Sequence, residues 1–257
     1  MHHTFQTITQ EVNCKINIGL QILRKRSDGY HDIQTIFYPT NFFTDKLTIE
    51  PHSHEFDFEC NTQDNIGKEE DNLCVKAFRL LQANYGIEKV KIILDKHIPV
   101  GAGLGGGSAD AAFTLKMLAA AFHLPATHQQ LLHYAAKLGS DVAFFIDNKP
   151  VYATGRGEIM EPVDLDLSAH HIRIWKPDFA VSTREAYSGI TPCETNICLT
   201  DEIKRPLSEW KDHIHNDFEE SIFDKYPELK QLKDNIYEEG AQYASMTGSG
   251  TAIYGIF

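Results

Sequence analysis

A run of glycines in the middle of the chain constrains the fold more than any other feature of the sequence. Five glycines fall within seven residues, at Gly101, Gly103, Gly105, Gly106 and Gly107. A segment rich in β-branched residues, Val90 to Leu94, precedes the run, and an alanine-rich segment, Ser108 to Phe122, follows it. The first segment predicts a strand and the second a helix.

A glycine-rich turn between a strand and a helix is typical of a phosphate-binding loop. Its bare backbone amides approach a ligand closely, and the positive end of the helix dipole favours an anion. A tight turn that only needs positive φ is the other interpretation. So many glycines would then weaken the fold, because glycine loses more conformational freedom on folding than any other residue. The run therefore predicts a polyphosphate site.

Several classes of phosphate loop are excluded by what surrounds the glycines. The chain contains no Gly-Lys-Ser or Gly-Lys-Thr, which a Walker loop needs. Gly101, Gly103 and Gly106 fit the dinucleotide spacing, but the segment Ala121 to Gln130, where an acidic ribose ligand would fall, has no Asp or Glu. No His-Arg-Asp or Asp-Phe-Gly follows, which argues against a protein kinase.

The rest of the chain predicts a mixture of strands and helices. Strand patterns cover Thr4–Leu23, Ile33–Tyr38, Lys46–Glu50, Ile172–Trp175 and Ala252–Phe257, with Asn41–Asp45 as a break between the second and the third. Helical patterns cover Asp71–Tyr85, the segment from Thr127 to Gly139, and Pro227–Glu239. Since the pattern changes beyond Pro150, we predict an α+β protein with one domain at residues 1–155 and a second at 156–257.

Charge, hydropathy and cysteine content limit the classes of partner and the cellular location that the sequence favours. The chain has 24 basic and 36 acidic residues, a net charge of −12, so no overall positive field attracts nucleic acid or an anionic membrane. We find no long apolar run and no basic-then-apolar leader, and we predict a cytoplasmic protein. The five cysteines, at irregular positions, predict free thiols, and the spacing of Cys193 and Cys198 argues against a zinc site.

The segment Pro99 to Ala112 resembles the central phosphate-binding motif of the GHMP kinases. Two further segments resemble other marks of this family, Lys15-Ile16-Asn17 near the start and Met246 to Gly250 near the end. The resemblance covers nearly the whole chain. It implies an N-terminal nucleotide domain like the second domain of ribosomal protein S5, a ferredoxin-like C-terminal domain and an active site between them. Members of the family continue past the last strand predicted here, so the resemblance also implies that a final helix and strand are lacking.

Within the family the resemblance is to kinases of an alcohol that carries a cytidine diphosphate. The segments that carry it are Cys14–Leu20, Arg26–His31 with Gln34-Thr35, Asp71–Leu73 and Gly139–Val142. The implied co-substrate is ATP, with Mg²⁺ expected beside it and no residue predicted as a dedicated metal ligand. We expect a monomer or a weak homodimer. Another GHMP kinase, of mevalonate, homoserine or a sugar, and a nucleotide-binding regulator without catalysis stay as alternatives.

Lys15 and Asp141 are the predicted catalytic residues. Lys15 lies among the apolar residues Val12, Cys14 and Ile16, where an idle buried charge is costly. Asp141 follows Gly139-Ser140, a sequence that also suits a turn and a helix cap. The resemblance implies that both lie at the acceptor hydroxyl, the carboxylate as the base and the ammonium as its electrostatic partner.

The remaining predicted site residues follow mostly from the resemblance. The ATP set comprises Asn72, the backbone at Lys96, Pro99, Gly101, Gly103, Leu104, Gly105, Gly106, Gly107 and Ser108, with Asp110 left as a helix-start carboxylate without another role. The substrate set comprises Asn17, Tyr30, His31, Thr183, Tyr187, Thr247, Gly248 and Ser249. In this set the two tyrosines stack on cytosine and the histidine bonds to its edge. From the residues alone, Tyr30 and His31 are surface turn residues, Tyr187 is a packing residue, and Thr247 to Gly250 is a β-turn.

Overall fold

The computed structural model describes residues 5–62, 67–195 and 197–257 of the chain. Thr4, where the first strand was predicted to begin, and residues 63–66 of the polar loop before the first helix lie outside these ranges. Contacts group the chain into two compact units, and each unit is assembled from separate stretches of sequence. The first holds Met1–Cys14, Phe43–Val100 and Gly105–Asn148, and the second holds Lys15–Phe42, Gly101–Leu104 and Lys149–Phe257.

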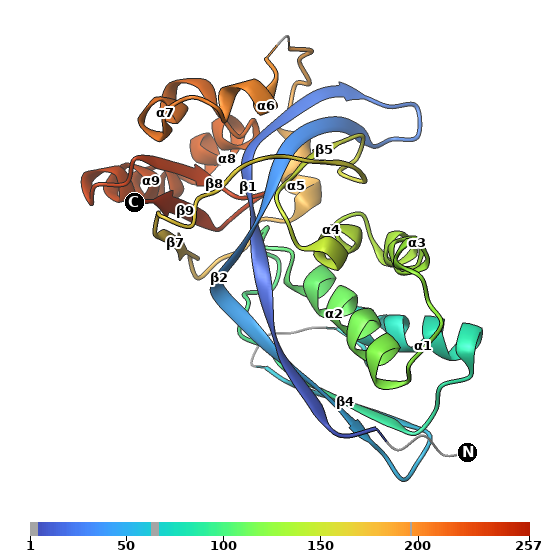
Figure 1. The fold of residues 1–257 in the computed structure, drawn as a ribbon. Coiled ribbons are helices and arrows are strands. Elements are labelled where there is room, and N and C mark those ends of the chain that lie inside the picture. Colours follow the sequence, from blue (N-terminus) through green and yellow to red (C-terminus); the bar gives the residue numbers. More distant parts are fainter. Residues whose placement is uncertain (1–4, 63–66, 196) are drawn as a thin grey trace. The chain divides into compact units, whose positions relative to one another are not determined.

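The first unit contains strands in the order β3-β4-β2, of which β4 and β2 are labelled in Figure 1. β3 (Phe56–Asn61) runs parallel to β4 (Val90–Asp95), and the end of β2 (His31–Pro51) runs antiparallel to β4. Val90, Ile92 and Leu94 are buried while the residues between them are partly exposed, so one face of β4 supplies the core. The strand predicted before the glycine run is confirmed.

The described part of the first unit contains four α-helices. They are α1 (Leu73–Tyr85), α2 (Gly106–Ala121), α3 (His128–Leu138) and α4 (Val142–Asp147), and α2 packs against the other three. Thr127 and Gln130 form a capping box at the start of α3, and Gly86 ends α1 in the left-handed conformation at φ 66°. A short 3₁₀ helix, Glu69–Asp71, precedes α1.

The second unit contains strand pairs from two sheets. Part of β1 (Ile8–Lys25) pairs with β2, and β2 continues through β5 (Val151–Thr154) to β6 (Ile159–Pro162). The other sheet has the order β7-β9-β8, built from β7 (Ile172–Trp175), β8 (Tyr243–Met246) and β9 (Ile253–Ile256). Both pairings of β9 are antiparallel, with Tyr254 opposite Ile174 and Ser245.

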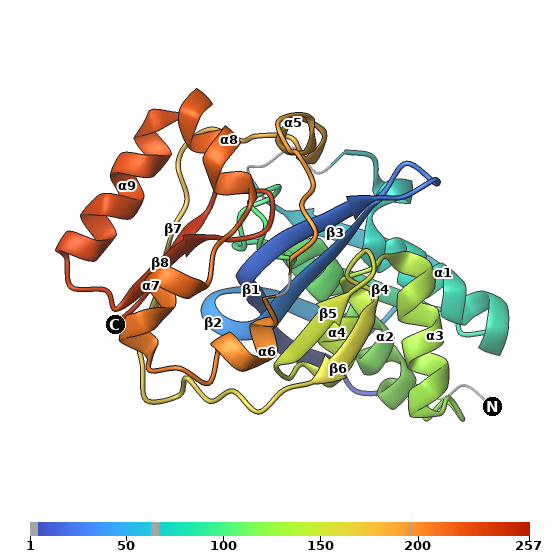
Figure 2. The ribbon, with the colours of Figure 1, turned by 90° about the horizontal axis from the view of Figure 1, so that it is seen from above.

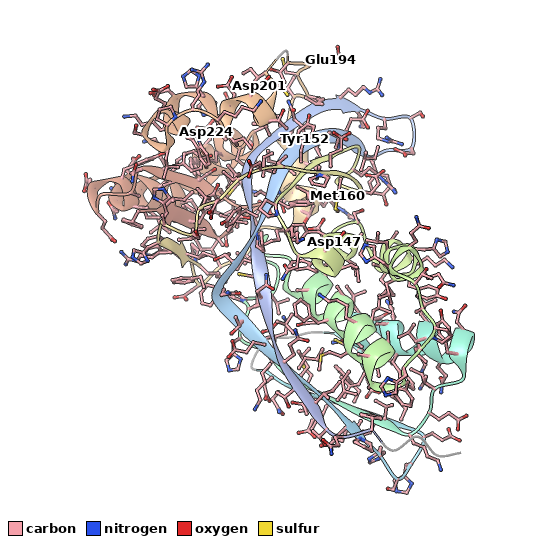
Figure 3. The ribbon with its side chains drawn as sticks, in the orientation of Figure 1. Asp147, Tyr152, Met160, Glu194, Asp201 and Asp224 are labelled. Carbon is pink, nitrogen blue, oxygen red and sulfur yellow. The ribbon has the colours of Figure 1, made fainter. Side chains whose placement is uncertain are left out.

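The second unit also contains helices. They are α5 (Thr183–Ser188), α6 (Leu199–Glu202), α7 (Trp210–His213), α8 (Phe218–Lys225) and α9 (Pro227–Glu238), with a 3₁₀ helix at Leu207–Glu209. Figure 2 shows α8 and α9 near β7 and β8. α9 packs on β8 and β9, and buries Leu229 and Ile236 in the core of the unit. Acidic residues such as Asp201 and Asp224 lie at the surface (Figure 3). No helix in the described ranges is long and apolar enough to cross a membrane.

β2 differs from the prediction because it runs without a break through Asn41–Asp45. One long strand pairs with β5 through Thr35–Phe37 and with β4 through Lys46–Pro51, so the backbone stays extended between the two ladders. The break was predicted from local composition, which does not report a partner strand. As a consequence Asp45 is buried, and it takes part in the site described next.

Candidate functional site

Lys15 lies at the centre of a polar cluster in the second unit. Its side chain is 3% exposed, and its ammonium donates to Asn17 Oδ1 at 2.6 Å and to the Gly103 carbonyl at 3.0 Å. The same ammonium lies 4.9 Å from the centre of the Phe37 ring, within the range of a cation–π contact. Buried charges need such partners, so this lysine is held at a fixed position inside the unit.

The loop Met246–Gly250, called the late loop below, contacts the glycine run at Gly103. A Cβ atom at Gly103 would lie 2.1 Å from the Thr247 carbonyl oxygen, and the residue has φ +79°, so only glycine fits. The Thr247 hydroxyl accepts the Asn17 backbone N–H at 3.0 Å and lies within hydrogen-bond distance of the Gly103 carbonyl, at 3.2 Å. Residues predicted from three distant segments of sequence are thus brought together.

Two residues that support this cluster were not singled out as site residues. Thr35 accepts from the Asn17 amide at 3.0 Å, and the Asn216 amide donates to the Met246 and Gly248 carbonyls at 2.7 and 2.9 Å. Thr35 lies in one of the segments that carry the family resemblance. Asn216 stands alone in a polar stretch, and no local signal distinguishes it.

Thr183 and Ser249 lie side by side. Thr183 is the first residue of α5, and its hydroxyl lies 3.3 Å from the Ser249 hydroxyl on the late loop. The Ser182 side chain caps the helix by accepting the Glu185 N–H, which fixes the direction in which α5 begins. Two predicted substrate residues therefore present neighbouring hydroxyl groups.

Of the three predicted aromatic residues, His31 and Tyr187 stack on each other, and Tyr30 contacts an arginine. His31 stacks on Tyr187 with ring centres 4.8 Å apart and an interplanar angle of 18°, and Phe218 meets Tyr187 edge-on at 4.9 Å. Tyr30 is 57% exposed, and the guanidinium of Arg156, a residue not predicted, lies 4.8 Å from its ring centre. Burial, with a smaller contribution from Lys25, lowers the pKa of His31 and favours the neutral ring.

In the first unit the start of α2 presents unpaired amides. Gly105 precedes the helix with φ 72°, and the N–H groups of Gly106, Gly107 and Ser108 fall in the first turn, where no intrahelical acceptor exists. A Cβ at Gly106 would lie 2.8 Å from Ile98 Cγ2, so this glycine is required by close packing. The first turn has the form of an anion site.

The other predicted nucleotide residues have structural partners of their own. Asn72 caps α1 by accepting the Cys74 N–H at 2.9 Å, and the buried Leu104 accepts the Lys15 N–H at 3.0 Å through its carbonyl. The Lys96 backbone N–H donates to the Asn61 carbonyl at 2.9 Å. Its ammonium pairs with the buried carboxylates of Asp45 and Asp110. Pro99 is partly exposed and begins the turn that leads to Gly101.

Asp141 stands immediately before α4. Its backbone is at the cap position, but its side chain makes no capping hydrogen bond. Its carboxylate is therefore not the helix cap that the turn sequence also suits.

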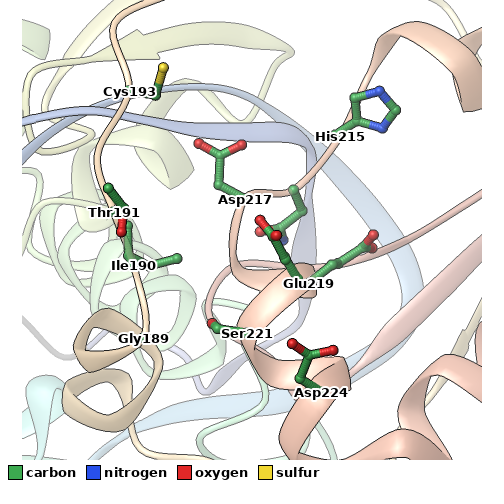
Figure 4. Close-up of a pocket in the computed structure, with 11 residues that line it drawn as sticks. Gly189, Ile190, Thr191, Cys193, His215, Asp217, Glu219, Ser221 and Asp224 are labelled. Atoms are coloured by element: carbon green, nitrogen blue, oxygen red, sulfur yellow. The ribbon is translucent and has the colours of Figure 1, made fainter.

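The second unit also holds a cavity of about 530 Å³ beside α8 (Figure 4). Its lining includes the carboxylates of Asp217, Glu219 and Asp224, and Asp217 accepts the Ile22 N–H at 2.7 Å. Of the predicted substrate residues that the structure describes, none lines this cavity. An acidic lining repels a diphosphate, so the cavity does not suit the predicted substrate.

The described cysteines form no disulfide bond with one another. Across residues 5–62, 67–195 and 197–257, no group of three or more His, Cys, Asp or Glu side chains is arranged to hold a metal ion.

Comparison with known proteins finds relatives over almost the whole chain. Residues 72–149 match the family model of the GHMP kinases N terminal domain, and residues 200–257 match that of the GHMP kinases C terminal. The 4-diphosphocytidyl-2-C-methyl-D-erythritol kinase of Bacteroides fragilis is 47% identical over 248 residues, which cover 95% of this chain and 90% of that protein.

Solved structures share the fold. A crystal structure of a 4-(cytidine 5'-diphospho)-2C-methyl-D-erythritol kinase matches with a TM-score of 0.84 and 31% identity, over 97% of this chain and 90% of that chain. The homoserine kinase of Cytophaga hutchinsonii matches with a TM-score of 0.73 over 97% of this chain and 85% of that chain, but at 16% identity. The second likeness bears on the fold alone.

Proposed function

This chain belongs to the GHMP kinases and, within them, to the family of its 4-diphosphocytidyl-2-C-methyl-D-erythritol kinase relatives, and we propose from this premise that it phosphorylates the same alcohol. The reaction moves the γ-phosphoryl group of ATP to the 2-hydroxyl of 4-diphosphocytidyl-2-C-methyl-D-erythritol, a step of non-mevalonate isoprenoid synthesis. The predicted α+β fold of this family is confirmed by the same comparisons.

The observation that carries the proposal is the buried ammonium of Lys15. Phosphoryl transfer is catalysed mainly by positioning and by charges that stabilise the transferred group. Lys15 is held by Asn17 and Gly103, in a cluster that the Thr247 hydroxyl completes. An ammonium fixed in this way needs no reorganisation during the reaction, which supports its role as the electrostatic partner of the acceptor oxygen.

Asp141 is the base in this proposal. A carboxylate removes the proton from the acceptor hydroxyl as the phosphorus–oxygen bond forms, and the leaving group is ADP. Asp141 directly precedes α4 and lies in Gly139–Val142, one of the segments that carry the family resemblance.

Recognition of the cytidine diphosphate is assigned to the aromatic residues and the late loop. The exposed ring of Tyr30 offers a stacking surface for cytosine, and neutral His31, ordered against Tyr187, offers a directional hydrogen bond. The paired hydroxyls of Thr183 and Ser249 suit a polyol with a neighbouring phosphate. Asn17 and the backbone at Thr247 and Gly248 complete this set.

ATP is assigned to the first turn of α2 and the glycine run before it. We expect Mg²⁺ to arrive with ATP, because the ion usually binds through substrate phosphates and only one or two carboxylates. A cytoplasmic location and a monomeric or weakly dimeric state complete the proposal.

Substrate preference is the test. The measurement is ADP release from ATP with the cytidine diphosphate alcohol, mevalonate, homoserine or galactose as the acceptor. We expect turnover with the first alone. Turnover with one of the others would replace the substrate with that of another GHMP kinase, and ATP binding without turnover of any acceptor would favour a regulator.

A further inference from the structure

A charged triad lies buried in the first unit behind the start of α2. Asp45 comes from β2, Lys96 directly follows β4, and Asp110 lies in the second turn of α2. The Lys96 ammonium contacts a carboxylate oxygen of Asp45 and lies 3.0 Å from Asp110 Oδ2. The side chains are 0%, 7% and 2% exposed, in that order along the chain, so water screens none of these charges well.

The two carboxylates have unequal surroundings. Asp45 Oδ1 accepts the backbone N–H groups of His97 and Ile98, at 2.5 and 2.7 Å, which stabilise its ionised form. Asp110 Oδ1 has no hydrogen-bond partner among the described residues. The oxygen atoms of Asp110 are therefore less well satisfied, and a proton on this carboxyl group removes a buried charge.

The charges of the triad do not balance when both carboxylates are ionised. One ammonium and two carboxylates then leave one buried negative charge, whereas a proton on Asp110 makes the triad neutral. Burial and the neighbouring Asp45 raise the pKa of Asp110 to about 8, although Lys96 acts in the opposite direction. Burial opposes the charge of Lys96, but the two carboxylates outweigh it and raise the pKa of the ammonium.

Two cysteines near the triad are also titratable, and the charge of Asp110 raises the pKa of both thiols. Cys60 comes from β3 and Cys74 from α1. Burial raises the pKa of Cys60 to about 11 and that of Cys74 well above its usual range, so both thiols stay neutral around pH 8. Asp110 is thus the member of this buried group whose charge changes in that range.

The triad touches the residue at which α2 begins. A Cβ atom on Gly106 would lie 2.9 Å from the Lys96 ammonium, so the cation packs directly against the first helical residue. Asp110 lies one turn further along the same helix. A charge that appears on the triad therefore appears beneath the amides of the first turn.

We propose that Asp110 is a positioning residue that makes ATP binding depend on pH. When Asp110 is protonated, the triad beneath the first turn of α2 is neutral. When Asp110 is ionised, the triad carries a negative charge that repels the triphosphate. This rests on the proposed function, because it takes the first turn of α2 as the phosphate site. It adds a role for a carboxylate that does not touch the substrate.

The test is the ATP affinity of wild type, Asp110→Asn and Asp147→Asn, measured by calorimetry from about pH 7 to about pH 10 at constant ionic strength and Mg²⁺ concentration. This range lies above the phosphate pKa of about 6, so the ATP charge stays nearly constant. Asparagine has the shape of aspartate and no charge. Asp147, a half-exposed carboxylate at the end of α4, is the matched control in the same unit.

We expect the wild-type dissociation constant for ATP to rise about tenfold with a midpoint near pH 8, as one added charge close to a triphosphate predicts. Asp147→Asn should follow the wild type, and Asp110→Asn should stay flat. A flat wild-type profile, or a profile of Asp110→Asn that follows the wild type, overturns the proposal.

Other outcomes distinguish a failure of the Asp110 proposal from a failure of the proposed kinase function. If wild type binds no ATP at any pH, both are wrong. The expected profile in a protein that phosphorylates a different alcohol overturns the substrate assignment alone. Should Asp110→Asn fail to fold, carboxyl ¹³C NMR of the wild type decides: one aspartate titrating near pH 8 supports the proposal, and none titrating above about pH 6 overturns it.

Discussion

At the residue scale, Asp141 carries the chemistry of the proposed reaction. Asp141→Asn keeps the size of the side chain but removes its basicity. We expect kcat to fall by about 100- to 10,000-fold, the usual contribution of a general base, with little change in ATP affinity. Steady-state kinetics and calorimetry measure the two quantities separately. A kcat within about threefold of wild type would remove Asp141 from the role of base.

Tyr30 tests recognition of the cytosine ring. Stacking of an aromatic side chain on a base contributes about 1–3 kcal/mol, so Tyr30→Ala should raise the KM for the cytidine diphosphate alcohol by roughly 5- to 150-fold. Tyr30→Phe should keep most of the affinity, because it keeps the ring. Phe42→Ala, which removes another exposed aromatic ring from the same stretch of chain, is the control and should leave KM unchanged. Equal effects of both alanine variants would argue against a stacking role.

Site residues could be predicted from the sequence only where they belong to a local motif. Lys15, Gly103 and Thr247 belong to compact motifs, and the structure brings these three together. Asp45 could not be found, because its importance comes from burial on a strand whose length local composition does not reveal. Asp110 was interpreted as an ordinary helix-start carboxylate, since no pattern along the chain reports its contact with Lys96, which follows β4.

At the element scale, the glycine run and the late loop depend on each other. Gly101 and Gly103 both have positive φ, but only a Cβ at Gly103 meets another backbone, that of Thr247. Alanine at Gly101 should cost only the left-handed conformation, about 1–2 kcal/mol. Alanine at Gly103 adds a steric conflict of a further ~1–3 kcal/mol.

Thermal denaturation of the two alanine variants measures this difference. The midpoint should fall clearly further for Gly103→Ala than for Gly101→Ala, and Gly103→Ala should also lose kinase activity, because Thr247 and Lys15 are displaced together. Equal midpoints for the two variants would contradict a close approach between the two loops.

The elements themselves were predicted where their signals are local. The capping box of α3, the glycine stop of α1 and the bounding proline of α9 mark their helices in the sequence. The continuous strand β2 was missed, because strand formation at Asn41–Asp45 depends on pairing with distant strands rather than on its own composition. The pairing of His31 with Tyr187 is a contact between distant segments that no sequence period encodes.

At the scale of the whole molecule, the buried triad links stability to pH. The folded protein raises the pKa of Asp110 to about 8, above the value of about 3.9 for an unfolded chain. The contribution of protonated Asp110 to stability is therefore full below about pH 4 and is lost as the pH rises through about 8. Asp110→Asn should not show this loss.

Urea unfolding at about pH 6 and about pH 9 measures the effect. The free energy of unfolding of wild type should fall relative to that of Asp110→Asn between the two pH values, and Asp147→Asn should behave like wild type. A constant difference between wild type and Asp110→Asn would show that Asp110 does not titrate in this range.

The central claim concerns which oxygen receives the phosphoryl group, and proton-coupled ³¹P NMR of the product tests it most directly. Carbon 2 of the acceptor carries a methyl group and no hydrogen. A phosphate ester on its hydroxyl should therefore show no three-bond coupling to a carbinol proton, while the diphosphate signals remain. A new monoester signal split by carbinol protons would place the phosphate on another hydroxyl and contradict the proposed reaction.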